Sequence, residues 1–221
     1  IKDNDNVVEG TLIKLRDYQQ EALDNTVRLY EQDKRFVGVK LPTGAGKSFV
    51  AMAEMMRRKK ENMVYFAPQE EILNQVQRHI VKYVLGKEVL NERHIEEMLH
   101  MNKQERKAFL ANKIYNPTAS VNELLFRLNK PDVSENEAEY IKSKILPRKT
   151  QYNDDVMDAI HTVFPHLDMC CYQSLTASKY EELMTKKVDF FVFDELHRTG
   201  ATTWKTQIDK LLDAQQDAQI F

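Results

Sequence analysis

Two short stretches of the chain carry the residue types needed to hold phosphate groups and a metal ion. The first stretch, here called the phosphate loop, reads Leu41-Pro42-Thr43-Gly44-Ala45-Gly46-Lys47-Ser48. It lies between a predicted strand over residues 36–41 and a predicted helix over residues 47–60. A glycine-containing turn that opens a helix presents backbone N–H groups and the positive helix end to an anion. The pattern therefore predicts a phosphate-binding site.

The residues at the end of the phosphate loop have separate expected roles. Gly44 and Gly46 let the backbone bend around phosphate oxygens without a Cβ in the way. Lys47 is expected to reach the β- and γ-phosphates, and the Ser48 hydroxyl to ligate Mg²⁺. The strict pattern has Gly at the first position, where this chain has Leu41. The alternative is an ordinary β-turn before a surface helix, which the strand–loop–helix context disfavours.

The second stretch, Asp194-Glu195, follows residues 188–193, the most hydrophobic predicted strand in the chain. Near-continuous apolar residues are typical of a strand covered on both faces, as in a parallel sheet. Ligands bind at the carboxyl ends of such strands. Asp194 is expected to hold the magnesium ion through its water shell, and Glu195 to orient and deprotonate an attacking water. A helix N-cap is the alternative role for this acidic pair.

Strands and helices alternate along most of the chain, which predicts a doubly wound, mainly parallel α/β sheet. Further strands are predicted over 62–68, 169–172 and from 219, and helices from 15, over 70–84, 178–186 and 203–214. Residues 86–167 instead read as four or five short helices without a convincing strand. Residues 1–85 and 168–221 are therefore predicted to form one nucleotide-binding domain, with 86–167 as a helical insertion.

Capping boxes mark three of the predicted helix starts. The pairs are Ser120 with Glu123, Ser134 with Glu137, and Ser178 with Glu181.

Composition restricts the partners and the compartment. The net charge is -2, which offers no global field for attracting nucleic acid, so any such binding must be local. The two cysteines, Cys170 and Cys171, are adjacent, which excludes a disulfide framework and predicts a reducing, cytoplasmic location. No apolar run approaches the roughly 18 residues of a membrane span. The start at Ile1 and the apolar end 218–221 favour a piece of a longer protein.

Together these stretches resemble the first RecA-like motor domain of a superfamily 2 DEAD/DEAH-box helicase or translocase, a P-loop NTPase. The phosphate loop is similar to motif I of that family. Asp194-Glu195-Leu196-His197-Arg198 is similar to motif II, a variant of the Asp-Glu-Ala-His box. The stretch from Asp194 to Ala201 and the later Trp204 resemble the group that includes type III and type I restriction motor subunits. The resemblance covers most of the chain outside residues 86–167.

The resemblance implies further nucleotide-site residues. Arg16 and Gln19 match the adenine-reading motif, in which a Gln side chain pairs with the N6 and N7 edge of the base. His197 is implied to couple the ATP site to a partner domain, and with Lys47, Asp194 and Glu195 it completes the expected catalytic set. The expected nucleotide contacts are Arg16, Gln19, Pro42, Thr43, Gly44, Ala45, Gly46, Lys47 and Ser48, with ATP and Mg²⁺ as cofactors.

Two stretches resemble motifs that lie along a nucleic-acid strand. The first runs from Tyr65 through Pro68 and Gln69 to Gln75, but lacks the basic residue often found after the proline. The second is Tyr172-Gln173-Ser174, preceded by a cysteine where threonine is common. These two stretches are the implied nucleic-acid contacts.

The function implied is the N-terminal motor domain of an ATP-dependent helicase or translocase, acting on DNA in preference to RNA. The implied partners are nucleic acid, a second RecA-like domain of the same chain, and a restriction-modification or nuclease subunit. Motif III and the second domain's arginine fingers are missing. An arginine finger contributes about 10³ to 10⁵ in rate, so the isolated chain is expected to be nearly inactive. The alternative is a nucleotide-controlled binding switch, or a restriction-complex subunit that does not unwind strands.

Overall fold

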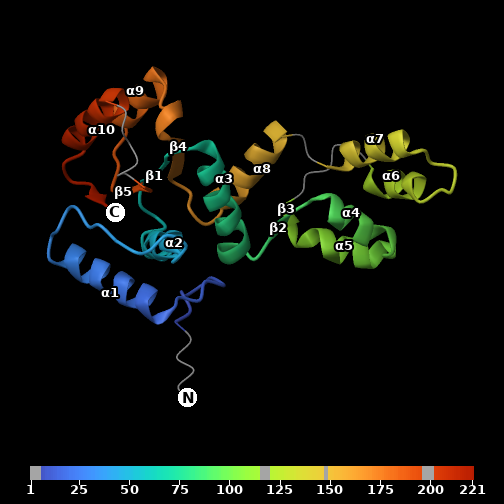
Figure 1. Ribbon diagram of the computed structural model, residues 1–221, viewed down its shortest axis with the longest axis horizontal. Coiled ribbons are helices and arrows are strands. Elements are labelled where there is room, and N and C mark those ends of the chain that lie inside the picture. The colour runs from blue at the N-terminus through green and yellow to red at the C-terminus, as the bar shows by residue number, and fades with distance from the viewer. Residues whose placement is uncertain (1–5, 115–119, 147–148, 196–201) are drawn as a thin grey trace, which may run out of the picture.

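A four-stranded parallel sheet lies at the centre of the fold (Figure 1). The computed structural model describes residues 6–114, 120–146, 149–195 and 202–221. The strand order is β4-β1-β5-β6, and every neighbouring pair runs parallel. The strands are β1 (Met63–Ala67), β4 (Leu167–Cys171), β5 (Phe190–Phe193) and β6 (Gln219–Ile220).

The segment before the phosphate loop joins the sheet only at its start. The Val37 N–H donates to the Ile220 carbonyl at 2.9 Å, and the Ile220 N–H donates to the Arg35 carbonyl at 2.7 Å. Phe36 forms an isolated parallel bridge with Ile220. The strand predicted over 36–41 is therefore reduced to one bridge. The reason is its position at the sheet edge, where its neighbour β6 is only two residues long.

Side chains of the sheet alternate between two cores, as the strand period of two requires. In β1, Met63, Tyr65 and Ala67 belong to one core, while Val64 and Phe66 belong to the other. The β5 side chains alternate in the same way. All residues of both strands are buried, which confirms strands covered on both faces.

Helices cover both faces of this sheet and complete the α/β fold that the sequence predicts (Figure 1). The first core contains side chains from α1 (Asp17–Glu31), α2 (Lys47–Arg57), α3 (Glu70–His79), its π-helical continuation η1 (Ile80–Val84) and α8 (Lys149–His161). The second contains side chains from α9 (Ala177–Thr185) and α10 (Thr202–Ala214). Among the helices of the described residues, none is long and apolar enough to cross a membrane.

The chain between η1 and α8 forms a helical unit with a core of its own, at the right of Figure 1. Its elements are β2 (Glu88–Val89), α4 (Glu92–Leu99), α5 (Lys103–Ala111), β3 (Lys113–Ile114), α6 (Val121–Leu128) and α7 (Glu135–Ile145). Ser120 and Ser134 are the N-cap residues of α6 and α7, which confirms the two predicted helix starts. The predicted capping boxes are wrong: the Ser134 hydroxyl accepts from the Glu137 N–H at 3.3 Å without the reciprocal bond, and the Ser120 side chain makes no capping hydrogen bond. The β2–β3 pair was not predicted, because two-residue strands carry no periodicity.

Helix α8 lies inside the predicted insertion but packs with the sheet. Its Val156 and Ile160 belong to the first sheet core, as does Phe164 just after the helix. The core of the helical unit takes its residues from Leu90 to Ile145. Side-chain packing therefore groups α8 with the sheet. The boundaries 86–167 of the insertion stay a prediction.

Helix α9 begins before the position that the capping-box pattern predicts. The Thr176 hydroxyl accepts a hydrogen bond from the Lys179 N–H at 3.3 Å. Ser178 already lies within the first turn, so the predicted Ser178 cap is wrong. Thr176 takes the cap because its backbone is extended, with φ -66° and ψ 159°.

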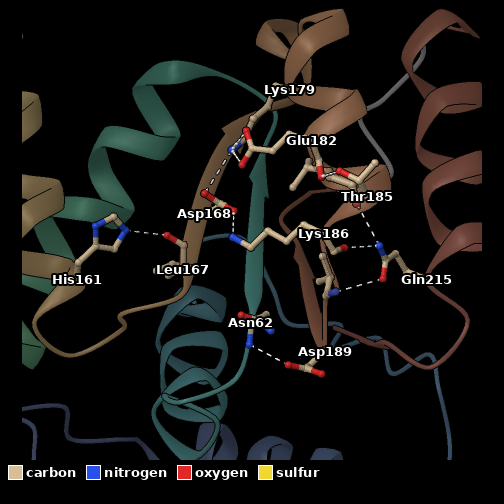
Figure 2. Close-up of polar contacts among 12 residues, drawn as sticks. Asn62, His161, Leu167, Asp168, Lys179, Glu182, Thr185, Lys186, Asp189 and Gln215 are labelled. Carbon is tan, nitrogen blue, oxygen red and sulfur yellow. Dashed lines mark hydrogen bonds and ion pairs between the residues drawn. The ribbon is translucent and has the colours of Figure 1, made fainter.

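Polar side chains tie the amino ends of the strands together and to α9 (Figure 2). The Asp168 carboxylate in β4 accepts hydrogen bonds from Lys179 Nζ at 3.3 Å and from Lys186 Nζ at 2.7 Å. The Asp189 carboxylate, just before β5, accepts from the Asn62 N–H at 3.0 Å. These contacts hold the end of the sheet that lies opposite Asp194.

Candidate nucleotide-binding site

The phosphate loop has the backbone of an anion-binding turn. Gly44 and Gly46 have φ values of 79° and 76°, in the left-handed region that favours glycine. The Ala45 N–H donates to the Pro42 carbonyl at 3.0 Å, which closes the turn. Gly46 is the N-cap of α2, and no side chain caps this helix end. The amides of the first turn of α2 are therefore open to an anion.

Helix α1 holds the phosphate loop through Gln19, which is only 4% exposed. Gln19 Nε2 donates to the Ala45 carbonyl at 2.7 Å and to the Gly46 carbonyl at 3.4 Å, while its Oε1 accepts from the Arg16 N–H at 2.8 Å. The Tyr18 hydroxyl also donates to the Ala45 carbonyl, at 3.1 Å. The Gln19 amide, expected to read adenine, thus bonds the loop backbone in this structure.

A cleft of about 490 Å³ lies at the carboxyl end of the sheet. Lys47 and Ser48 line it from the first turn of α2, and Asp194 and Glu195 line it from the end of β5. Apolar and aromatic side chains of the edge segment, β1, β5 and β6 form much of the remaining wall. The fold thus brings together four residues that the sequence predicts to act together.

Asp194 is fixed in this cleft by hydrogen bonds to its side chain and its backbone. The Tyr65 hydroxyl donates to Asp194 Oδ2 at 3.1 Å, and the Asp194 N–H donates to the Phe66 carbonyl at 2.9 Å. Burial raises the pKa of Asp194 above the ordinary Asp value, and the nearby Glu195 carboxylate raises it further. The Tyr65 hydrogen bond and the Lys47 charge act in the opposite direction and favour the carboxylate.

Tyr65 is a residue of the cleft to which the sequence assigned no role in nucleotide binding. Its pKa is raised well above the ordinary tyrosine value, first by burial and then by the Asp194 carboxylate. The hydroxyl therefore stays protonated and remains a donor to Asp194. The one sequence signal was a hydroxyl in an otherwise apolar strand.

Glu195 has an unusual backbone for a residue with a side chain. Its φ is 52°, in the left-handed region that few residues other than glycine adopt. Such conformations cost free energy and cluster at functional sites. The chain turns at this residue directly after β5, while the Glu195 side chain still lines the cleft.

The donor set of the cleft fits Mg²⁺. Ser48 and Asp194 offer a hydroxyl and a carboxylate, and hard oxygen ligands of this kind hold Mg²⁺ together with substrate phosphates and water. Among the residues that the structure describes, no three His, Cys, Asp or Glu side chains gather around a possible metal position. The described protein ligands alone would leave several coordination positions for phosphate and water.

A second cavity, of about 260 Å³, adjoins the same loop. Arg16 and Gln19 line it together with residues 44–46, and Phe49 and Tyr83 form an aromatic part of its wall. The rings of Phe49 and Tyr83 pack edge to face, with centroids 5.1 Å apart. Arg16 and Gln19 thus lie beside the phosphate loop, and their contact with a base stays a prediction.

The predicted nucleic-acid contacts lie just beyond the carboxyl ends of β1 and β4. Pro68 follows β1, and Gln69 is the exposed N-cap residue of α3. Gln75 is exposed within α3, and Gln173 is exposed in the 3₁₀ turn η2 (Tyr172–Ser174). Their contact with nucleic acid stays a prediction.

Tyr172 differs from the other predicted contacts because its side chain is buried. It is 2% exposed and stacks on Phe66, with ring centroids 5.7 Å apart. Its hydroxyl donates to the Asp194 carbonyl at 3.3 Å. The ring is therefore not available to stack on a base in this conformation, and it supports Asp194 instead.

Some predicted residues lie outside the described part of the chain. His197 belongs to the segment 196–201, which the structure does not describe. The same holds for the side chains of Ser174 and Trp204.

Comparison with protein families identifies a match over nearly the whole chain. The model of a family described as type III restriction enzyme, res subunit, matches residues 12–220. The matched range includes the phosphate loop, Asp194 and Glu195. A search of curated proteins finds no match.

Proposed function

Since this chain belongs to the type III restriction enzyme res subunit family, we propose that it is the ATP-hydrolysing motor domain of a DNA helicase or translocase. Family membership confirms the resemblance to restriction motor subunits. It supports an ATP-dependent, helicase-like motor domain of the restriction-enzyme type. DNA as the substrate and a restriction-modification or nuclease partner are parts of the proposal.

One observation carries this proposal. Lys47 and Ser48 share a cleft with Asp194 and Glu195, although a long stretch of chain separates the two pairs. Phosphoryl transfer needs a phosphate cradle, a metal ligand, a group that positions water and a dry site. The apolar walls of the cleft provide the last of these.

The residues of this chain would divide the work as follows. The amides of the phosphate loop and the Lys47 ammonium bind the β- and γ-phosphates. Ser48 and Asp194 hold Mg²⁺, directly or through water, and Mg²⁺ neutralises charge on these phosphates when bound. Glu195 orients a water molecule and accepts its proton as the oxygen attacks the γ-phosphorus. The bond to the β-phosphate oxygen breaks, and its electron pair leaves with ADP.

The domain organisation is part of the proposal. Residues 1–85 and 168–221 form the first RecA-like domain, and residues 86–167 are a helical insertion whose last helix, α8, packs on the sheet of that domain. A second RecA-like domain supplies the arginine finger, so the isolated chain binds nucleotide but hydrolyses it slowly.

The test measures nucleotide binding by this chain and ATP turnover by the parent protein. Lys47→Ala is expected to weaken binding of a fluorescent ATP analogue by at least tenfold, because it removes the cation from the phosphates. The matched control Lys34→Ala removes an exposed lysine of the turn after α1 and should leave the affinity unchanged.

Turnover of the parent protein is then compared without nucleic acid and with single- or double-stranded DNA or RNA. Stimulation by DNA that Lys47→Ala abolishes supports the motor function. Turnover that no nucleic acid changes would contradict it and favour a nucleotide-controlled switch.

A further inference from the structure

A basic cavity lies where the helical unit joins the sheet-bearing part, near β2 in Figure 1. This junction cavity has a volume of about 390 Å³ and is bounded by the end of α3, η1, β2 and the first turn of α4. Four cationic side chains line it: Arg78, Lys82, Lys87 and Arg93. No residue to which the sequence assigned a role lies in it.

Within the described part of the chain, three of the four cations of the junction cavity keep their charge unpaired, whereas Arg93 Nε donates to Glu97 Oε1 at 3.0 Å. Glu88 is the acidic residue among its described lining, and Lys113 Nζ already donates to Glu88 Oε2 at 3.0 Å. Among the residues that the structure describes, Arg78, Lys82 and Lys87 form no ion pair. All three are exposed, so their charges face the solvent at the cavity.

The helix that carries two of these cations is also unusual. Arg78 and Lys82 are four residues apart, so their like charges lie on one face and repel each other. Burial lowers the pKa of the neighbouring His79, and the charges of Arg78 and Lys82 lower it further. The backbone between the two cations changes from α- to π-helix at Ile80–Val84, and π-helical turns occur frequently at functional sites. An anion between these side chains would relieve the repulsion.

We propose that the junction cavity binds the phosphate backbone of nucleic acid, as a contact separate from the nucleotide cleft. This proposal rests on the proposed function, in which the chain acts on DNA. With a net charge of -2 the chain needs a local cluster of positive charge to bind DNA, and the junction cavity supplies one. It places part of the DNA path on the root of the helical unit.

The lining favours phosphate over a protein partner. Protein interfaces centre on apolar and aromatic anchors, and no Phe, Tyr or Trp of the described residues lines the cavity. Of its three apolar residues, Val81 and Leu90 are 1% and 4% exposed and only Val89 is half-buried. Arg and Lys side chains at the mouth are the groups that hold phosphate oxygens.

The test uses the 221-residue chain and fluorescence anisotropy with labelled duplex and single-stranded DNA at several salt concentrations. The variant Arg78→Gln/Lys82→Gln/Lys87→Gln is expected to lose roughly tenfold in duplex affinity for each contact removed at 0.1 M salt. The log–log salt slope should become shallower by about 0.9 per contact on duplex DNA. The matched control Lys34→Gln/Lys59→Gln/Lys60→Gln removes three exposed lysines away from the cavity and should change neither quantity.

Binding of the ATP analogue, measured on the same variants, separates the two proposals. Loss of DNA affinity with unchanged nucleotide affinity supports the junction cavity. Unchanged DNA affinity and salt slope would overturn the cavity proposal and leave the nucleotide site standing. A wild-type chain that binds nucleotide but no nucleic acid would overturn the cavity proposal and the DNA part of the proposed function. If polyglutamate displaces labelled DNA as well as unlabelled DNA does, the cavity proposal is overturned in favour of an acidic protein partner.

Discussion

Asp194, the proposed Mg²⁺-holding residue, combines burial with hydrogen bonds that keep its carboxylate in place. Tyr65 donates to its carboxylate, and Tyr172 donates to its carbonyl. The raised pKa shows that burial of the charge outweighs this support. The buried Asp194 charge therefore carries a stability cost, which is common for residues held at functional sites.

This cost gives a pH-dependent prediction at Asp194. Its raised pKa means that the folded state binds the proton more tightly than the unfolded state, so stability falls as pH rises through that pKa. Asp194→Asn stays neutral and can still accept the Tyr65 hydrogen bond. Its free energy of unfolding in urea should exceed that of the wild type at pH 7. The difference should shrink as the pH falls through the raised pKa, and it should vanish below about pH 4, the ordinary Asp value, where both states bind the proton.

The control for Asp194→Asn is Asp217→Asn, which removes an exposed acid between α10 and β6. Equal stability of wild type and Asp194→Asn at every pH would show that the Asp194 charge has no burial cost.

At the scale of elements, α1 is held against the phosphate loop by the buried Gln19 amide and, at the surface, by the Tyr18 hydroxyl. Gln19 bonds two loop carbonyls and the N–H at the start of its own helix. A Cβ added at Gly46 would lie 2.5 Å from Gln19 Nε2, whereas a Cβ at Gly44 would meet nothing within 4 Å. Alanine at Gly44 therefore tests backbone strain alone, while alanine at Gly46 tests backbone strain together with the loss of the Gln19 contact.

The prediction compares alanine at these two positions. Gly44→Ala and Gly46→Ala should each cost about 1–2 kcal/mol for a left-handed backbone. Gly46→Ala should cost about 1 kcal/mol more, because Gln19 must give up its hydrogen bonds to the loop. Urea denaturation measures both values.

A double variant tests the cause of the extra loss. In a Gln19→Ala background most of the difference between the two glycine variants should disappear, since the colliding amide is gone and only the Phe49 ring, whose Cδ2 would lie 3.1 Å from the added Cβ, still has to move. A difference that persists in full there would assign the extra cost to another contact.

At the scale of the whole molecule, the two ends of the sheet serve different purposes. The carboxyl end carries the nucleotide cleft, while the amino end is closed by polar side chains that only hold elements together (Figure 2). Gln215 is the clearest case at the amino end. Its Nε2 donates to the carbonyls of Leu183 and Lys186 at 3.1 and 2.6 Å, and its Oε1 accepts from the Val188 N–H at 3.1 Å.

Gln215→Ala should therefore destabilise the protein by about 1–3 kcal/mol, because it leaves buried backbone groups without their partner. Binding of the ATP analogue under native conditions should not change, since the cleft lies at the other end of the strands. Urea denaturation measures the stability, and titration with the fluorescent ATP analogue measures the affinity. Gln216→Ala, at an exposed neighbouring position, is the matched control. A loss of nucleotide affinity with intact stability would contradict this division.

Local sequence patterns were sufficient to predict most of the helices and strands and the phosphate loop. The apolar runs ending at Ala67 and Phe193 predicted buried parallel strands, because such strands need apolar residues on both faces. Glycine spacing before Lys47 predicted a loop that bends around phosphate, and the structure places both glycines in the left-handed region that few other residues adopt. The strand predicted over 36–41 is only a single bridge at Phe36, because its neighbour at the sheet edge, β6, is short.

The sequence by itself thus determined the parallel α/β fold and the residue types of the nucleotide cleft, since periodicity and glycine placement are local properties. Only the tertiary structure decided what surrounds those residues. It brought Tyr65 to Asp194, turned the Gln19 amide onto the loop and buried the Tyr172 ring. It also gathered the cations of the junction cavity from different elements. Burial and contacts between distant segments depend on packing, which no local pattern specifies.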